Sequence, residues 1–486
     1  MKRVLKVLVK VFLIILLPVF TIILVRAFDA RRMPALGVWH RASLDAEFKA
    51  GDYHENFTFQ DYLRIEERLF KELGEEVYQK VEQTGALKFN RYSFRSPSNP
   101  QSFSRNWNRS YEFIPSKIRG GALFLHGLTD SPYSLRGVAE IFKQQGFYVL
   151  GLRIPGHGTI PAALTSVTWA DWLAATKVGA AHVRKQIDKH SPFYVVGYSN
   201  GGALAVKYTL DAAQNSNLPM PQRLVLFSPA IGVSRLGAVA DWHKILSFIP
   251  YFEKFKWTSI QPEYDPFKYN SFSKNAGDQI YHLTRKVQRQ IDEVKRAGQI
   301  YKLPPILTFQ SLVDSTVLIP AIIEKLHNKI ENPNSELVIF DVNRHAPLKD
   351  FLASDHSKLL MQLEKRTDLP YKITVVTNAS PDSLAIIAKT KMPRSKMFNN
   401  ASLDLNWPRG LYSLSHVAIP VAPEDPVYGS GKQEGPISGL RLGSIEPRGE
   451  RNILRVSVSQ LMRLRYNPFF DYVKQRLTGV LSAETD

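Results

Sequence analysis

A serine stands between two glycines where an apolar run gives way to a helical pattern. The run is FYVVGYS at residues 193–199, and residues 197–201 form the motif G-x-S-x-G. In this context the motif is typical of a nucleophile elbow, a tight strand-to-helix turn that exposes the serine hydroxyl. The helix that follows points its free N–H groups and its positive dipole end at that oxygen. The pattern indicates nucleophilic catalysis by Ser199; the alternative is a glycine-rich turn with an inert serine.

Backbone donors for a developing oxyanion are expected at two places near this serine. One is the N–H of Asn200, which directly follows it. The other lies in the loop after the apolar run 121–127, where Leu128 supplies an N–H and Gly127 lets the backbone approach closely. His126 in the same loop could act as a base, but we interpret it as a brace that holds the loop by hydrogen bonding.

Apolar runs alternate with helical stretches on both sides of the motif. Seven runs have the length and composition of buried strands: 121–127, 147–153, 193–199, 223–229, 305–311, 336–342 and 372–378. Helical stretches follow several of them, at about 135–145, at 168–188 and directly after Ser199. Strands that alternate with helices predict a mostly parallel sheet with helices on both faces, and ligands bind such sheets at the carboxyl ends of the strands.

Residues 230–300 interrupt this alternation. They are rich in Trp, Phe, Tyr and Lys and contain a helical stretch at about 277–297. We interpret them as a lid over the strand ends; the alternative is a peripheral packing domain. Elsewhere we expect helices at 61–84, after 378 and at 469–477, and a strand at 453–458.

Four segments resemble the α/β-hydrolase superfamily in sequence and in order. They are LFLHGLTDSPYSLR (123–136), RIPGHG (153–158), WADW (169–172) and VGYSNGG (196–202). They are most similar to the bacterial carboxylesterase and monoacylglycerol-lipase-like branch, and the similarity covers about residues 119–345. The resemblance implies the α/β-hydrolase fold, a mostly parallel eight-stranded sheet, a lid after the sixth strand, and a serine–acid–histidine triad. It implies no metal and no organic cofactor.

The resemblance places the acid after the next-to-last strand of the sheet. PILTFQSLVDSTV puts Asp314 just beyond the run 305–311, so Asp314 is our candidate. Its role would be to hold the imidazole in one tautomer and to stabilise the charged form. Asp341 is the second choice, because it lies within the run 336–342 and not past its end.

Two histidines compete for the role of base. His416 lies in GLYSLSHVAIP, whose S-x-H-V-A sequence resembles the histidine loop of some family esterases, and we favour it. His345 follows Asp314 at a spacing that resembles simple family members. However, Arg344 beside it would disfavour a protonated imidazole. His356 is a distant third choice.

The N-terminus predicts membrane attachment. Basic residues flank the uncharged run Val11–Val25, and a helix counted from Val4 would be about 33 Å long, enough for a hydrocarbon core of ~30 Å if Lys6 and Lys10 reach the headgroups. We favour an uncleaved signal-anchor, a transmembrane helix, over a signal peptide, because no A-x-A pattern follows the run. The positive flank predicts a bacterial inner-membrane protein whose catalytic body lies in the periplasm.

The composition is that of a globular protein. The 486 residues are 44% hydrophobic and 22% charged, which excludes a disordered chain, a collagen-like repeat and a multi-span membrane protein. The net charge is +19, yet no nucleic-acid-binding motif occurs, so we expect no nucleic-acid partner. Cysteine is absent and the histidines lack spacings such as H-E-x-x-H, so we expect no metal site.

These patterns divide the chain into four parts. They are an anchor (1–32), a linker with a helical and strand segment (33–118), a hydrolase core (119–365) with its lid at 230–300, and a C-terminal extension (366–486) that contributes the histidine loop.

The predicted reaction is hydrolysis of carboxylic esters, with lipid or other hydrophobic acyl esters as substrates, through an acyl-enzyme. The alternatives are a serine peptidase or amidase, an acyltransferase on the same fold, and a non-catalytic membrane-anchored scaffold.

Overall fold

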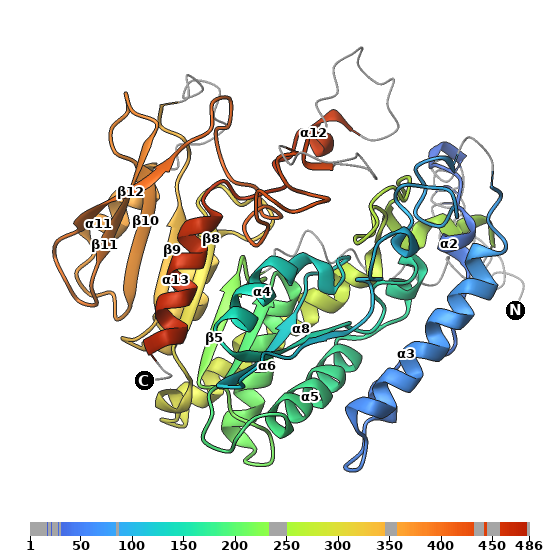
Figure 1. Ribbon diagram of the computed structural model, residues 1–486, viewed down its shortest axis with the longest axis horizontal. Coiled ribbons are helices and arrows are strands. Elements are labelled where there is room, and N and C mark those ends of the chain that lie inside the picture. Colours follow the sequence, from blue (N-terminus) through green and yellow to red (C-terminus); the bar gives the residue numbers. More distant parts are fainter. Residues whose placement is uncertain are drawn as a thin grey trace, which may run out of the picture.

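Figure 1 shows the computed structural model of the protein. It describes residues 31–83, 87–232, 250–345, 357–431, 442–444 and 457–483, together with Leu17, Thr21 and Phe28. The membrane anchor predicted for residues 1–32 lies almost wholly outside these residues. Within the described part of the chain, no helix is both long and apolar enough to cross a bilayer.

A single large sheet forms the centre of the molecule, and ten strands of the described residues belong to it in the order β1-β3-β2-β4-β5-β8-β9-β10-β11-β12. The strands are β1 (Tyr111–Phe113), β2 (Gly120–Leu125), β3 (Phe147–Leu152), β4 (Phe193–Tyr198), β5 (Arg223–Phe227), β8 (Ile306–Ser311), β9 (Glu336–Phe340), β10 (Lys372–Asn378), β11 (Ala385–Lys391) and β12 (Asn399–Asn406). From β3 to β10 all neighbours are parallel, whereas β1, β11 and β12 are antiparallel additions at the edges. Every residue of β2, β3, β4 and β8 is buried, because helices cover both faces of a parallel sheet.

Helices form a layer on each face of the sheet (Figure 1). One apolar core joins the sheet to α5 (Trp169–Lys185), α6 (Asn200–Gln214) and α8 (Lys274–Arg296). A second core on the other face joins it to α4 (Arg136–Gln144) and α13 (Phe470–Ala483). The remaining elements are α2 (Val38–Arg41), α3 (Phe59–Leu73), α9 (Ile319–Ile322), α10 (Asn328–Ile330), α11 (Ser357–Lys365), α12 (Val458–Leu461), β6 (Trp257–Ser259) and β7 (Phe272–Ser273).

The local patterns confirm most of the predicted elements. All seven apolar runs form buried parallel strands, and the helices expected near 135–145, 168–188 and 469–477 and after Ser199 appear as α4, α5, α13 and α6. The helix expected at 61–84 begins two residues earlier as α3, where Thr58 and Asp61 form a capping box that satisfies its first free N–H groups. The mostly parallel sheet with helices on both faces is therefore confirmed.

Two expectations about the sheet were wrong. In the described residues the large sheet has ten strands rather than eight, because β1, β11 and β12 add to the seven predicted runs. The helix expected after residue 378 is instead the hairpin of β11 and β12. The burial of β11 alternates along its length, which is typical of a strand with one covered face.

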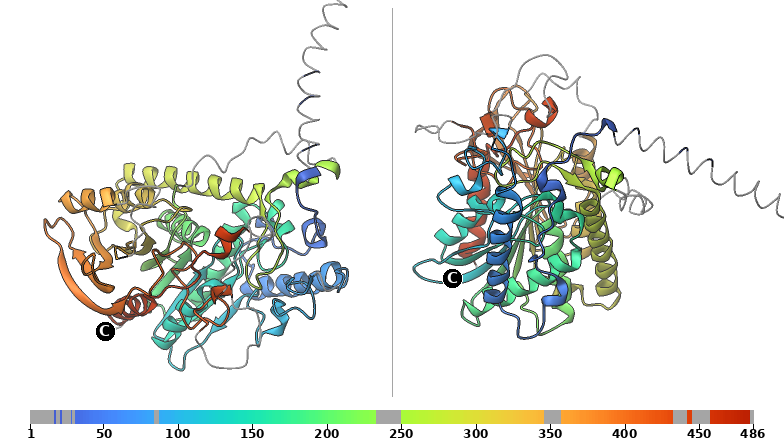
Figure 2. Two further views of the ribbon diagram at one scale, coloured as in Figure 1. Left: turned by 90° about the horizontal axis from the view of Figure 1, so that it is seen from above. Right: turned by 90° about the vertical axis from the view of Figure 1, so that its right-hand side faces the viewer.

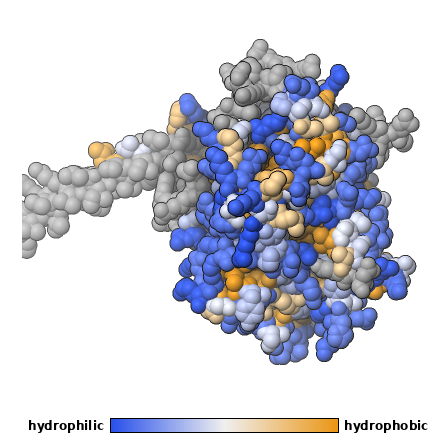
Figure 3. Space-filling model, turned by 90° about the vertical axis from the view of Figure 1, so that its left-hand side faces the viewer, coloured by the Kyte–Doolittle hydropathy of each residue, from blue (hydrophilic) through white to orange (hydrophobic). Residues whose placement is uncertain are grey.

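These strands lie at the opposite end of the molecule from α3 (Figure 2), and the end face in Figure 3 is largely hydrophilic. The strand expected at 453–458 falls almost entirely outside the described residues, and Val458 begins α12.

The segment predicted as a lid contains two different structures. Residues 233–249 lie outside the described residues. Helix α8 covers the sheet beside α6, with Leu283, Val287 and Ile291 in the core, so it forms part of the helical layer. Between them, residues 257–273 carry the short β6–β7 hairpin and meet the loop after β2, where the Tyr269 N–H donates to the Thr129 carbonyl at 2.8 Å.

Candidate active site

Ser199 occupies a strained turn between β4 and α6. Its backbone has φ 52° and ψ −113°, in the region that L-residues rarely adopt. A methyl group on Gly201 would lie 1.9 Å from the Leu125 carbonyl oxygen, so only glycine fits there. The Ser199 N–H donates to the Phe227 carbonyl at 2.9 Å, which ties the turn to β5. The half-buried serine is thus fixed at the carboxyl edge of the sheet.

Asp314 and His416 form a buried hydrogen-bonded pair. His416 Nδ1 donates to Asp314 Oδ2 at 2.7 Å, and the side chains are 5% and 0% exposed respectively. Asp314 Oδ1 accepts the N–H groups of Thr316 at 2.8 Å and Val317 at 2.9 Å. Burial by itself would raise the pKa of Asp314, but the charge and hydrogen bond of His416 and these N–H groups hold that pKa below its usual value. Asp314 is therefore an ionised partner for an imidazole.

Gln310 also binds the carboxylate of Asp314. Its Nε2 donates to Oδ2, the same oxygen that accepts from His416, at 3.0 Å, and to the Val317 carbonyl at 3.0 Å. Gln310 lies in β8 and is fully buried. Sequence analysis did not identify this residue, because its only signal is a polar side chain within an apolar strand.

Three hydrogen bonds hold the loop that carries His416 against the strand ends. Ser311 Oγ, at the end of β8, donates to the Leu414 carbonyl at 2.8 Å. Asn343, just after β9, donates its N–H to the Tyr412 carbonyl at 2.7 Å and its amide to the Leu411 carbonyl at 2.8 Å. The imidazole ring centroid of His416 lies 5.3 Å from that of Tyr198, the residue before the nucleophile. The loop therefore brings His416 beside the turn of Ser199.

The second choices for base and acid, His345 and Asp341, lie apart from the Asp314–His416 pair. His345 is exposed, and its Nδ1 lies 3.3 Å from the Pro381 carbonyl oxygen. Asp341 is held by Arg344 through two contacts of 2.7 and 2.9 Å and by Thr377 at 2.8 Å. The ion pair lies just after β9, and the Thr377 hydrogen bond ties it to β10, so Asp341 has a structural role in the sheet. His356, the third choice, lies outside the described residues.

The two expected oxyanion donors lie at the same edge of the sheet. Asn200 is the first residue of α6, and Leu128 follows β2 in a partly exposed turn. A methyl group on Gly127 would lie 2.6 Å from an Asp130 carboxylate oxygen and 2.9 Å from the Tyr198 ring, so the turn needs glycine. The N–H groups of Leu128 and Asn200 stay the predicted donors.

His126 braces the turn, as its sequence position suggested. Its Nδ1 lies 2.9 Å from the Gly127 carbonyl oxygen, and its Nε2 accepts the Ile154 N–H at 3.0 Å. This pattern requires the proton on Nδ1. Burial, followed by the charge of His157, lowers the pKa of His126 well below its usual value. His126 is therefore a neutral structural residue with both ring nitrogens occupied.

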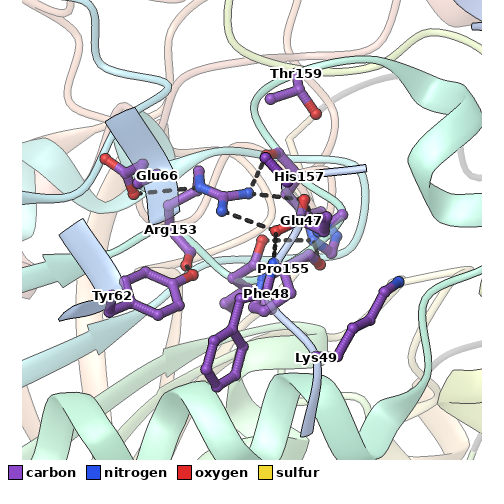
Figure 4. Close-up of polar contacts among 12 residues, drawn as sticks. Glu47, Phe48, Lys49, Tyr62, Glu66, Arg153, Pro155, His157 and Thr159 are labelled. Atoms are coloured by element: carbon purple, nitrogen blue, oxygen red, sulfur yellow. Dashed lines mark hydrogen bonds and ion pairs between the residues drawn. The ribbon is translucent and has the colours of Figure 1, made fainter. Parts of the chain in front are cut away.

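A buried ion cluster supports the loop that contains Ile154. Arg153 binds Glu47 at 2.9 and 3.1 Å and Glu66 at 3.2 Å, and its side chain is 0% exposed (Figure 4). Glu47 also accepts the Gly156 N–H at 2.8 Å. Glu47 and Glu66 come from the N-terminal segment, so that segment holds the loop on which His126 depends. The sequence placed Arg153 in the RIPGHG segment but did not predict the cluster, because nothing in the spacing of the three residues indicates that they meet.

Comparison with known proteins defines the class. Residues 116–351, just under half of the chain, match the family model described as "Serine aminopeptidase, S33". Together with the parallel sheet and the nucleophile turn, this match shows that these residues form an α/β-hydrolase domain.

Three individual matches are proteins described as monoacylglycerol lipases or lipolytic enzymes. The chain is 33% identical over 86 residues to the thermostable monoacylglycerol lipase of Bacillus sp. (strain H-257), and this covers 18% of the chain and 33% of that relative. The chain thus aligns with about a third of that relative's length. A solved structure of the Paleococcus ferrophilus monoacylglycerol lipase is 16% identical and covers 48% of this chain and 88% of its own, with a TM-score of 0.36. A structure from the metagenome-derived lipolytic enzymes LipS and LipT is 22% identical, covers 54% and 98%, and also has a TM-score of 0.36.

Proposed function

We propose that this protein is a serine hydrolase that cleaves carboxylic esters, with Ser199, Asp314 and His416 as its triad. The observation that carries the proposal is the buried hydrogen bond between Asp314 and His416 beside the turn of Ser199. A serine, an imidazole and a buried carboxylate at one edge of a sheet are the groups that acyl transfer requires. His345 stays the alternative base, and the experiment on the two histidines below distinguishes them.

The proposed reaction passes through an acyl-enzyme. His416 accepts the proton of the Ser199 hydroxyl as its oxygen attacks the ester carbonyl carbon, and Asp314 stabilises the imidazolium. The N–H groups of Leu128 and Asn200 bind the oxyanion. His416 then protonates the leaving alcohol, and water, activated by the same imidazole, releases the acid. Each step needs only groups of this chain and water.

We propose hydrophobic acyl esters, including lipid esters, as the substrates. The similarity to monoacylglycerol lipases supports this class. The lid segment lies directly beside the oxyanion turn, where Lys268 binds Asp130 at 2.9 Å and the Tyr269 N–H donates to the Thr129 carbonyl. We also propose that residues 1–32 anchor the enzyme in a bacterial inner membrane with its catalytic body in the periplasm. A protease added outside spheroplasts should then degrade the full chain; a protected chain would contradict this orientation.

A peptidase or amidase is the second candidate, and the description of the matching family favours it. Ester and amide hydrolysis use the same triad and differ in the leaving group. Turnover of p-nitrophenyl decanoate should exceed turnover of aminoacyl p-nitroanilides by orders of magnitude. Faster cleavage of the anilides would make the peptidase or amidase the favoured function.

Labelling with a fluorophosphonate tests whether the site is catalytic at all. The full chain should react with the probe in a 1:1 ratio, and mass spectrometry should place the adduct on Ser199. A protein that stays unlabelled and inactive towards both substrate classes would be the non-catalytic scaffold.

A further inference from the structure

A cavity lies directly beside the proposed catalytic histidine. Tyr198 and Val417, the neighbours of Ser199 and His416 in the chain, form part of its wall. The loop after β2, residues 264–270 of the lid segment and residues 460–465 near the C-terminus enclose the rest. The Tyr198 ring lies 5.3 Å from the imidazole ring of His416, so a group bound in this cavity would lie one side chain away from the proposed base.

Two of the three cations that line this cavity already have acidic partners. Lys268 binds Asp130 at 2.9 Å. Arg465 binds Asp265 at 3.3 Å, and the buried Asp265 accepts the hydroxyl of Tyr428 at 2.5 Å as well. Within each pair the positive and negative charges cancel. The two pairs therefore form part of the cavity wall without giving it a net charge.

Arg463 is the third cation, and the described residues offer it no acidic partner. It is exposed and lines the same cavity as Tyr198. Burial raises the pKa of the Tyr198 phenol well above its usual value, and Arg463 opposes that rise. Among the described residues, the charges of Lys268, Arg465 and Arg463 exceed those of Asp130 and Asp265 by one positive charge.

We infer that this cavity receives the anionic group of an amphiphilic ester and that Arg463 is its counter-ion. A guanidinium presents paired N–H donors that match the oxygens of a carboxylate or phosphate. The tyrosine and valine side chains of the same wall, among them Tyr264, Val417 and Val421, would contact the apolar part next to that group. The inference rests on the proposed ester hydrolysis and narrows its substrates to esters that carry a negative charge near the scissile bond.

A matched pair of substrates tests this directly. 1-Decanoylglycerol and 1-decanoylglycerol 3-phosphate share the acyl chain and the scissile ester and differ only in the phosphate. The measured quantity is the ratio of kcat/KM for the phosphate ester to kcat/KM for the neutral ester, at low ionic strength and with monomeric substrate. For the wild-type full chain the ratio should exceed one. Added salt should lower it, because salt screens an exposed pair.

Variants of Arg463 connect the preference to this residue. Arg463→Gln should lower the ratio by about three- to tenfold, and Arg463→Glu should lower it further. The control is Arg409→Gln, which removes an exposed arginine in the turn after β12 and should leave the ratio unchanged.

The outcomes separate this inference from the proposed function. An enzyme that is labelled at Ser199 and hydrolyses the neutral ester, but whose ratio is the same in wild type and both Arg463 variants, overturns the inference alone. So does a labelled enzyme that does not turn over the phosphate ester. A chain that is not labelled and hydrolyses neither ester overturns both.

Discussion

Asp314 Oδ2 and His416 Nδ1 lie 2.7 Å apart although 102 residues separate them in the chain. The intervening residues include three strands, β10, β11 and β12, that extend the sheet away from the site. The chain then returns to the ends of β8 and β9, where Ser311 and Asn343 bind the histidine loop. The added strands β10, β11 and β12 do not separate Asp314 from His416, because hydrogen bonds hold the loops of both residues at the same edge of the sheet.

Alanine substitutions should distinguish the two histidines. His416→Ala should lower kcat by about 10³- to 10⁴-fold, because no group remains to accept the serine proton. His345→Ala, the matched control, should change kcat less than about twofold, because an exposed side chain away from the site contributes little. Steady-state hydrolysis of p-nitrophenyl decanoate measures both. The reverse order would move the base to His345.

Ser199→Ala should abolish turnover without unfolding the protein. The expected loss of kcat is at least about 10³-fold, together with loss of fluorophosphonate labelling. Ser166→Ala, on an exposed serine, serves as the control and should keep both properties. Circular dichroism should show equal folding of the two variants. Residual labelling of the Ser199 variant at another serine would show that the nucleophile lies elsewhere.

Gln310 should act as a positioning residue for the acid. Gln310→Leu removes a donor from the carboxylate of Asp314, and kcat should fall about three- to tenfold with little change in KM. A carboxylate with one donor fewer attracts the imidazolium proton more strongly. The acid limb of the kcat/KM profile should therefore move to higher pH. A lower rate with an unmoved profile would mean that Gln310 only supports packing.

The buried cluster of Arg153 should be essential for stability. Glu47→Gln should lower the free energy of unfolding by about 3 kcal/mol, because it leaves a buried guanidinium with one carboxylate instead of two. The control is Glu67→Gln, which removes a 73% exposed carboxylate from its pair with Arg109 and should cost less than about 1 kcal/mol. Urea denaturation measures both variants. Equal losses would show that burial does not strengthen the Arg153 cluster.

Buried neutral histidines should make the protein sensitive to acid. Burial lowers the pKa of His157 to about 4 and that of His327 to about 3. In the unfolded chain both would titrate near 6.5, so below that pH the unfolded state binds protons that the folded state does not. Stability should therefore fall as the pH drops from about 6.5 to about 4, by up to ~1.4 kcal/mol per pH unit for each histidine. Urea midpoints at a series of pH values measure this slope, and His327→Gln should reduce it. A slope that does not change in this variant would contradict the low pKa of His327.

Much of the fold could be predicted from local patterns. Buried strands such as β4 and β8 are short apolar runs, and their length and composition are visible without any knowledge of their neighbours. Hairpin β11–β12 was mistaken for a helix, because only the pairing of β11 with β10 and of β12 with β11 makes these residues strands. Strand formation depends on neighbours more than helix formation does.

The sequence by itself determined the turn of Ser199, because glycines at fixed local spacing are what a strained strand-to-helix turn requires. It also determined where the seven central strands lie along the chain. Only the tertiary structure decided that Asp314 meets His416 and not His345, and that Arg153 meets Glu47, which lies 106 residues away. The physical reason is that such pairs depend on which loops return to the same edge of the sheet. No local spacing encodes that return.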